Sequence, residues 1–303
     1  MQQSIRIGVF GAVNGWYFKD LQRVANALGG FEILPLDFTS LQVSNLSGSA
    51  AHACRLDSPD ERVSLKDLDA LLVRAMPLGS LEQIIFRMNA LHVAEQMGVP
   101  VLNSPRCLEI CIDKWLTLQK VQLSGIPTPR TVCCQTRDDA MEAWSNLGGD
   151  CVVKPIFGGE GRGIVRVTDS DMAWRVFSTL EQLQAVHYVQ EYIENDGSDL
   201  RCLVIDEAIY CMRRTSRGGW RANVAQGGTG AFHEPTFEEV DLAYRAAKGV
   251  GGWMVGVDLL EDLDGQLMLL EVNAVPGWRA TAQAVGVDLA QELLVAISTK
   301  TIS

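Results

Sequence analysis

The stretch 256–273 constrains the fold most, because it predicts a β-hairpin whose register can be counted. Asp264-Gly265 between two apolar runs is a strong signal for a two-residue hairpin turn. Counting outward from that turn places Asp258 directly opposite Glu271, where Cβ atoms lie about 4.5–5.5 Å apart. Asn273 comes two residues after Glu271, so its side chain points to the same face. Three oxygen-bearing side chains are therefore expected on one patch of an antiparallel sheet.

These three side chains predict a site for a divalent cation. Two carboxylates that face each other repel, and a bound cation offsets that repulsion. A ligand set made only of oxygen atoms suits Mg²⁺, with Mn²⁺ as a substitute. An exposed acidic hairpin is the alternative interpretation, but Asp258 and Glu271 stand within apolar runs that indicate burial.

A glycine-rich loop lies upstream, between two apolar runs that indicate strands. Lys154 precedes four glycines within six positions, Gly158, Gly159, Gly161 and Gly163. Glycines let main-chain N–H groups approach an anion closely, and the lysine adds a positive charge. The loop is not a Walker A motif, because no Gly-Lys-Ser/Thr sequence follows. The pattern favours a phosphate-binding loop over a plain glycine-rich turn.

Between these two segments come an extended stretch, 188–193, and a series of arginines. The extended stretch could hydrogen-bond an adenine edge through its main chain, although a plain strand is the default interpretation. Arginines beside an acidic metal site are what phosphoryl transfer needs, because they neutralise the charge of the transferring group. The arginines of this series are Arg201, Arg213, Arg214 and Arg221.

Strand and helix patterns divide the chain into three parts. Residues 1–104 alternate strands with helices, which predicts a parallel α/β domain with an irregular surface excursion at about 40–66. Residues 105–186 and 187–303 mix antiparallel strands with helices, which predicts two α+β subdomains. The glycines after the first strand do not match the dinucleotide fingerprint G-x-G-x-x-G, so we interpret them as a turn.

The composition disfavours several classes of protein. With 26 basic and 37 acidic residues the net charge is -11, so nucleic acid is not expected as a main partner. No apolar run approaches the length of a membrane-spanning helix, and the N-terminus lacks a signal-peptide layout. The eight scattered cysteines are therefore expected to be reduced thiols in the cytoplasm. Cys107 and Cys111 share a predicted helix face, but no second pair has the spacing of a zinc site.

In their order along the chain, these motifs resemble those of the ATP-grasp ligases, and within them the RimK-like branch, over about residues 70–300. KPIFGGEGRGI resembles that family's phosphate loop, YVQEYI its adenine hinge, DLRCLV its Asp-x-Arg strand and WRANVAQGG its arginine–asparagine loop. GVDLL and EVNAVPG resemble its metal-binding strands. The resemblance implies an ATP-grasp fold preceded by a parallel α/β domain, the pre-ATP-grasp domain, with ATP and Mg²⁺ as cofactors.

The resemblance also implies roles for single residues. The implied metal ligands are Asp258, Glu271 and Asn273, and the implied catalytic residues are Arg201 and Arg221. The implied nucleotide contacts are Lys114, Lys154, Gly159, Gly161, Gly163, Glu191, Tyr192, Asp199 and Asn223. The segment AVPGWRATAQ departs from the family pattern, in which a Ser-Pro-Gly turn without Trp-Arg is more frequent. Expected substrate contacts are Arg74, Arg213, Gly277, Trp278 and Arg279.

The implied reaction is ATP-dependent formation of an amide between a substrate carboxylate and an amino acid, with L-glutamate favoured, through an acyl phosphate. The expected acceptor is acidic: a cofactor such as tetrahydromethanopterin, another metabolite or a peptide C-terminus. Alternatives are an ATP-grasp ligase for a different product, such as a dipeptide, and a nucleotide-binding regulatory module without turnover. Family members are often dimers or tetramers, so a homo-oligomer stays open.

Overall fold

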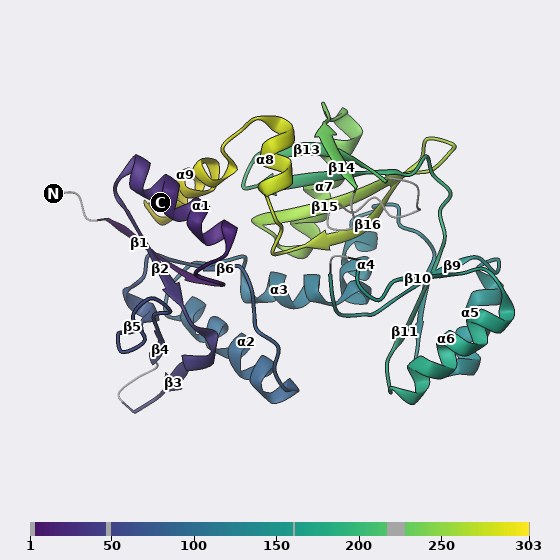
Figure 1. Ribbon diagram of the computed structural model, residues 1–303, viewed down its shortest axis with the longest axis horizontal. Coiled ribbons are helices and arrows are strands. Elements are labelled where there is room, and N and C mark those ends of the chain that lie inside the picture. Colours follow the sequence, from purple (N-terminus) through teal and green to yellow (C-terminus); the bar gives the residue numbers. More distant parts are fainter. Residues whose placement is uncertain (1–3, 47–49, 160, 217–227, 303) are drawn as a thin grey trace.

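A computed structural model describes residues 4–46, 50–159, 161–216 and 228–302. The first unit is a parallel sheet with helices on it, at the left of Figure 1. Its order is β2-β1-β6-β7, and its four strands are almost wholly buried, as expected when helices cover both faces. The bounds are β1 Ile5–Phe10, α1 Trp16–Leu28, β2 Phe31–Leu36, β6 Ala70–Val73, α2 Leu81–Gln96 and β7 Val101–Leu102.

The stretch expected to be an irregular excursion contains a second, antiparallel sheet of order β3-β4-β5. Its strands are short, and Ala51, Ala53 and Val63 point into the core. The sequence signal is weak because one face of β4 is built from alanines rather than large apolar residues. The bounds are η1 Phe38–Ser40, β3 Gln42–Ser44, β4 Ala50–Cys54, β5 Arg62–Ser64 and η2 Leu65–Asp67.

The small subdomain, at the right of Figure 1, is an antiparallel sheet of order β10-β9-β11-β8 with two helices on one face. Its core is separate from the rest of the molecule and centres on Phe177 and Val153. The bounds are β8 Thr131–Cys134, α5 Arg137–Asn146, β9 Cys151–Lys154, β10 Val165–Val167, α6 Ser170–Gln182 and β11 His187–Glu191.

The large subdomain is an antiparallel sheet of order β14-β13-β12-β15-β16. Helices α3, α4 and α7 cover one face, α8 packs on β13 and β14, and α9 lies beside α1 (Figure 1). The strands are β12 Ser198–Ile205, β13 Ala208–Thr215, β14 Thr229–Phe232, β15 Met254–Glu261 and β16 Leu267–Asn273. The helices are α3 Pro105–Ile112, α4 Lys114–Leu123, α7 Phe237–Val250, α8 Arg279–Val285 and α9 Leu289–Ile302.

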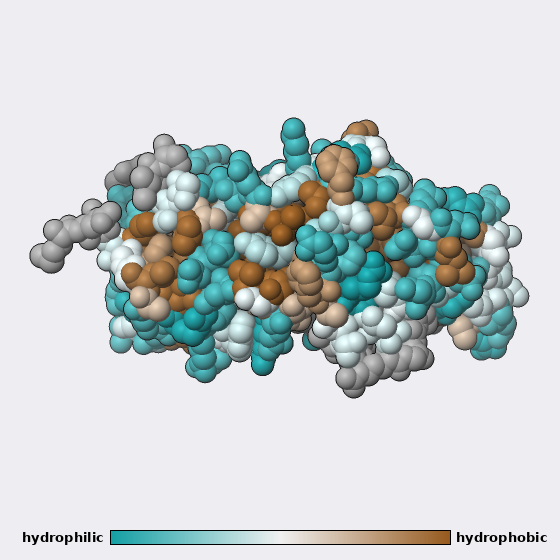
Figure 2. Space-filling view, turned by 90° about the horizontal axis from the view of Figure 1, so that it is seen from above, coloured by the Kyte–Doolittle hydropathy of each residue, from teal (hydrophilic) through white to brown (hydrophobic). Residues whose placement is uncertain are grey.

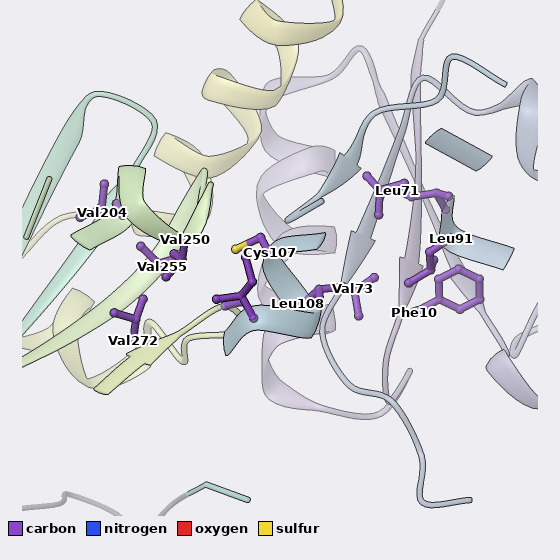
Figure 3. Packing of buried hydrophobic residues seen from close by; sticks show 14 of the residues in the cluster. Phe10, Leu71, Val73, Leu91, Cys107, Leu108, Val204, Val250, Val255 and Val272 are labelled. Atoms are coloured by element: carbon purple, nitrogen blue, oxygen red, sulfur yellow. The ribbon is translucent and has the colours of Figure 1, made fainter. Parts of the chain in front are cut away.

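The N-terminal sheet and the large subdomain share two clusters of buried apolar residues. Figure 3 shows Cys107 and Leu108 of α3 between Val73 on one side and Val255 and Val272 on the other. The domain boundaries expected after residues 104 and 186 stay predictions. Helices α3 and α4 pack on α7 and β16 of the large subdomain, and β11 completes the small sheet. Apolar runs reveal that a segment is buried, but its partners are fixed only by tertiary pairing.

In the face shown in Figure 2, hydrophilic residues lie among the apolar ones. Within the described part of the chain, no single helix is long and apolar enough to cross a membrane. Helices α8 and α9 meet the length and composition test only together, as a pair bent by 107°. Five apolar residues of α9 are buried in the core that it shares with α1, namely Leu289, Ala290, Leu293, Leu294 and Ile297.

Candidate active site

The hairpin β15–β16 places Asp258 opposite Glu271, as counted from the sequence. The ladder ends at the turn with Glu261 opposite Leu267, whereas a two-residue turn at 264–265 would pair 263 with 266. A bulge next to Asp258 then restores the counted register, and Asn273 comes to lie opposite Gly256. The predicted pairing is thus confirmed, although two departures from the simple hairpin had to cancel to give it.

Asp258 lies in a network of buried charges on one face of the large sheet. Its two carboxylate oxygens are each 3.0 Å from an arginine nitrogen, one of Arg201 and one of Arg214. Arg214 also donates two hydrogen bonds, of 2.5 and 2.8 Å, to the carboxylate of Asp199. Burial opposes the charge of Arg214, but Asp258 and Asp199 outweigh that effect and raise its pKa above the ordinary value. The guanidinium therefore stays protonated and bridges the carboxylates of Asp199 on β12 and Asp258 on β15.

Strand alternation separates the neighbouring arginines of β13. Asp199 lies opposite Arg214 in the ladder, so these two side chains share a face. Arg213 points to the other face, where it donates to Ser198 Oγ at 3.2 Å and lies 3.8 Å from Glu261. The structure thus brings Arg214 to the carboxylate pair and keeps Arg213, the expected substrate contact, away from it.

Two lysines flank the glycine loop between β9 and β10. Lys154 Nζ donates to Gln190 Oε1 at 2.6 Å, and Lys114 Nζ donates to the main-chain oxygen of Gly158. Burial lowers the pKa of Lys154 to about 8, while the charge of Glu271 opposes the decrease. Gly161 and Gly163 have φ values of 70° and 73°, a conformation that side chains with a Cβ rarely adopt. Glycine is therefore favoured at these two positions of the loop.

The predicted hinge leaves β11 beside β8 and β9. Arg130 donates from its main-chain N and its Nε to the Glu191 carboxylate, at 2.7 and 2.6 Å. The N–H groups of Glu191 and Tyr192 donate to the main-chain oxygens of Arg130 and Asp150. The Arg166 guanidinium lies 3.4 Å from the centre of the Tyr192 ring, which fixes the ring. Both main-chain donors at the hinge are therefore used within the protein.

These segments enclose one pocket between the small and large subdomains, of about 840 Å³ with its open mouth included. The pocket brings together seven of the expected residues from distant parts of the chain. These are Lys154, Gly161, Glu191, Tyr192, Asp199, Asp258 and Glu271.

The carboxylate pair fits a divalent cation. Asp258 Oδ1 is buried and, despite the Arg201 nitrogen 3.0 Å away, makes no aligned hydrogen bond within the described residues. The described residues contain no group of three or more His, Cys, Asp or Glu side chains able to hold a metal. The third expected ligand is an amide, and Asn273 Oδ1, which accepts from Val275 N at 2.9 Å, keeps a second lone pair. This oxygen-only set suits Mg²⁺.

The remaining expected residues lie elsewhere or outside the described ranges. Arg221 and Asn223 fall in 217–227, which the structure does not describe. Trp278 is fully buried, with its indole N–H donating to Asp20 at 2.9 Å, and its ring meets the Tyr17 ring edge to face. Arg279 lies over the exposed ring of Trp16, 5.3 Å from its centre.

The sequence argument gave Gln190 no role, and it named Arg214 only as one of a series of arginines. Gln190 is buried and joins Lys154 to Thr131 through its amide. No short-range pattern marks it, since it stands in a plain strand. Arg214 could have been found, because β12 and β13 meet at a two-residue loop, 206–207, whose register places Arg214 opposite Asp199.

Comparison with known proteins agrees with this geometry. The protein-family model for the RimK-like ATP-grasp domain matches residues 111–297. The tetrahydromethanopterin:alpha-L-glutamate ligase of Methanosarcina acetivorans is 31% identical across 92% of this chain and 94% of its own length. The glutamate–LysW ligase ArgX of Sulfolobus acidocaldarius is 31% identical across 67% of this chain and 74% of its own length.

A solved structure also shares the fold over the whole chain. The ATP-grasp ligase PsnB, complexed with a phosphomimetic variant of a minimal precursor, Mg and ADP, has a TM-score of 0.73. It covers 99% of this chain and 100% of its own, at 21% identity. The ATP-grasp fold and the parallel N-terminal sheet expected from the sequence are thus confirmed. The chain belongs to the RimK-like ATP-grasp family of ligases.

Proposed function

We propose that this protein joins an acidic acceptor to an amino acid, L-glutamate, by an ATP-dependent amide bond. The observation that carries the proposal is the pocket in which Asp258 and Glu271 face Lys154 and the glycine loop. The M. acetivorans relative, named as a glutamate ligase over nearly the full length, supports glutamate as the added amino acid.

The nucleotide lies between the two subdomains in this proposal. Its phosphates contact Lys114, Lys154 and the loop glycines 159, 161 and 163, and its ribose lies near Asp199. Glu191 and Tyr192 line the adenine. The N–H groups of both hinge residues donate within the protein, to Arg130 O and Asp150 O, so the base is recognised through other main-chain groups of this segment.

Asp258, Glu271 and Asn273 would hold the magnesium, with Mn²⁺ as a substitute. When bound, the metal supplies positive charge beside the transferring phosphoryl group. Arg201 and Arg221 contribute further positive charge there, and Asn223 contacts the γ-phosphate. Charge of this kind, fixed in advance within a pocket, stabilises the transition state more than water does.

Two steps follow from this arrangement. A carboxylate oxygen of the acceptor attacks the γ-phosphorus of ATP, and the bond to ADP breaks, which gives an acyl phosphate. The amino group of glutamate then attacks the acyl carbon, inorganic phosphate leaves, and the amine loses a proton. Enclosure between the subdomains excludes water from the acyl phosphate.

The acceptor in our proposal is an acidic small molecule. Two relatives are named for tetrahydromethanopterin, and the one from Methanocaldococcus jannaschii is 33% identical across 76% of this chain and 79% of its own length. Arg213, Gly277 and Arg279 stay candidate contacts for the acceptor or the amino acid. For Arg74, beside Trp278, we propose a different role, argued below.

The deciding experiment measures phosphate release from ATP and Mg²⁺ with L-glutamate and a panel of acidic acceptors, including pterin cofactors and peptides. Mass spectrometry of the products follows. Release that needs both substrates, with an acceptor mass gain of one glutamate minus water, supports the proposal. Release with a different amino acid indicates another ATP-grasp product, such as a dipeptide. Tight ATP binding without release with any pair favours a regulatory nucleotide-binding module.

A further inference from the structure

Two side chains of the N-terminal domain hold the chain segment that follows the carboxylate pair. The segment is 273–277, which leaves β16 directly after the expected metal ligand Asn273. Its main-chain oxygens at Ala274 and Pro276 accept hydrogen bonds from Asn103 and Arg74, at 2.6 and 2.8 Å. Both donors come just after strands of the parallel sheet, β7 and β6.

Asn103 acts as an extra rung between β15 and β16. Its Nδ2 donates to Met254 O as well as Ala274 O, both at 2.6 Å. Its Oδ1 accepts from the N–H groups of Trp253 and Met254, at 2.7 and 2.8 Å. The side chain is buried, and only an amide supplies two donors and an acceptor at this size. It therefore bridges the two strands just beyond their last ladder pair, Gly256 with Asn273.

Arg74 is held by ring stacking rather than by many hydrogen bonds. Its guanidinium lies 5.0 Å from the centre of the Tyr17 ring and 4.6 Å from that of Trp278. Its Nε is buried without a hydrogen-bond partner within the described residues. Tyr17 approaches Gly277 so closely that a Cβ at that position would collide with its hydroxyl group. The two rings thus orient the Arg74 guanidinium toward Pro276 O. Tyr17 also packs directly against Gly277, which lacks a side chain.

The held segment continues directly into the site. Pro276 and the Arg201 guanidinium both lie against Gly256, at the place that a Cβ would occupy in another residue. Arg201 in turn lies 3.0 Å from Asp258. The held segment and the carboxylate pair therefore meet around Gly256 and Arg201. Burial lowers the pKa of Arg74 to about 10, so its charge does not change near neutral pH.

We propose that Asn103 and Arg74, the interdomain clamp, are positioning residues that fix Asn273 and the end of β16 so that the carboxylate pair can hold magnesium. Within the described residues, neither side chain of the clamp contacts a residue that lines the pocket. The clamp instead links the N-terminal domain to the segment after Asn273, next to the expected metal ligands. The proposal rests on the proposed function in one respect, namely that Glu271 and Asn273 bind the metal.

The test measures the affinity of the full-length protein for ADP by calorimetry, once in EDTA and once with saturating Mg²⁺. The variants are Arg74→Met, Arg74→Lys and Asn103→Ala. We expect Arg74→Met and Asn103→Ala to lose about tenfold or more of the Mg²⁺-dependent strengthening, as outer residues of metal sites do. Affinity in EDTA should stay within about twofold, because the lysines and hinge are untouched.

The conservative variant separates positioning from plain stability. Lysine can still donate to Pro276 O but cannot stack as a plane, so Arg74→Lys should recover part of the Mg²⁺ effect. Arg6→Gln is the matched control: Arg6 also donates to a main-chain oxygen, that of Asp67 at 3.0 Å, but within the described residues it bonds neither to the 273–277 segment nor to the rings around Arg74. It should behave like the wild type. Hydrogen exchange should quicken at the Trp253 and Met254 amides in Asn103→Ala.

Equal Mg²⁺ strengthening in the wild type, Arg74→Met and Asn103→Ala would overturn the clamp. Glu271→Ala distinguishes that result from failure of the metal assignment, since it should abolish the strengthening whether or not the clamp acts. If the wild type itself shows no strengthening, both the metal assignment and the clamp are refuted. If Asn103→Ala does not fold, the two Arg74 variants and the control still decide.

Discussion

At the scale of single residues, the acidic pair of the β15–β16 hairpin has two different surroundings. Asp258 is compensated by Arg201 and Arg214, whereas Glu271 faces the pocket together with Lys154. The two arginines hold the Asp258 carboxylate in one orientation before any ligand binds. The Glu271 carboxylate lines the pocket, so its removal should lower the catalytic rate most directly.

The variant Glu271→Ala should lower kcat at least about a hundredfold, since a metal at the phosphoryl group supplies several kcal/mol. The fold should stay intact because the side chain is only partly buried. Steady-state phosphate release measures the effect. Asp264→Asn, in the exposed turn of the same hairpin, is the control. Near-normal turnover of Glu271→Ala would refute the metal assignment.

His187 should make stability depend on pH. It is fully buried against Phe177, and both ring nitrogens are without hydrogen-bond partners within the described residues. Burial lowers the pKa of His187 below its ordinary value. Below about pH 6.5 the imidazole therefore binds a proton in the unfolded chain but stays neutral in the folded one. Stability should therefore fall as the pH drops through that range, by at most about 1.4 kcal/mol per pH unit.

Urea unfolding at about pH 7.5 and at about pH 5 measures this loss of stability. These two pH values bracket the ordinary pKa of histidine. His187→Leu should show a smaller loss between the two pH values, because leucine does not titrate. An identical loss in both proteins would assign the acid sensitivity to other groups.

At the scale of elements, β11 serves the site through a buried amide. Gln190 accepts from Lys154 Nζ and donates to Thr131 and Tyr188, so the strand aims the lysine into the pocket. The alternation of β12 and β13 has a comparable effect, since it brings Arg214 rather than Arg213 to the acidic pair. The sequence located these strands, but the direction in which a side chain points depends on strand pairing between segments that are far apart in the sequence.

The variant Gln190→Leu should weaken ADP binding in EDTA roughly tenfold, because a hydrogen bond to a charged group contributes about 1.5–3 kcal/mol. The lysine would then lose its fixed direction while the apolar replacement fills the buried space. Calorimetry measures the change. Gln182→Leu, on the exposed side of α6, should bind ADP like the wild type. Unchanged affinity in Gln190→Leu would show that Lys154 needs no such support.

At the scale of the whole molecule, the pocket lies between parts whose cores are of unequal independence. The N-terminal and large subdomains share two hydrophobic clusters, whereas the small subdomain has its own. A ligand between them should therefore stabilise the small subdomain preferentially. The added stability is about 2.7 kcal/mol at a ligand concentration one hundred times Kd.

Hydrogen exchange measured by mass spectrometry should show this coupling. On addition of ADP and Mg²⁺, peptides from β9 and β11 should gain protection, whereas β1 in the shared core should change little. Equal protection of both regions would indicate that the three units open together, as one cooperative body.

The sequence by itself determined the ligase family, the glycine loop between two strands and the facing carboxylates, because these depend on local spacing and on hairpin geometry. It missed the β3-β4-β5 sheet and the burial of Trp278. Only the tertiary structure decided which arginine meets Asp258 and that Asn103 and Arg74 grip the segment after Asn273. Such contacts join residues up to about two hundred positions apart, as Arg74 and Pro276 are, so no local pattern records them.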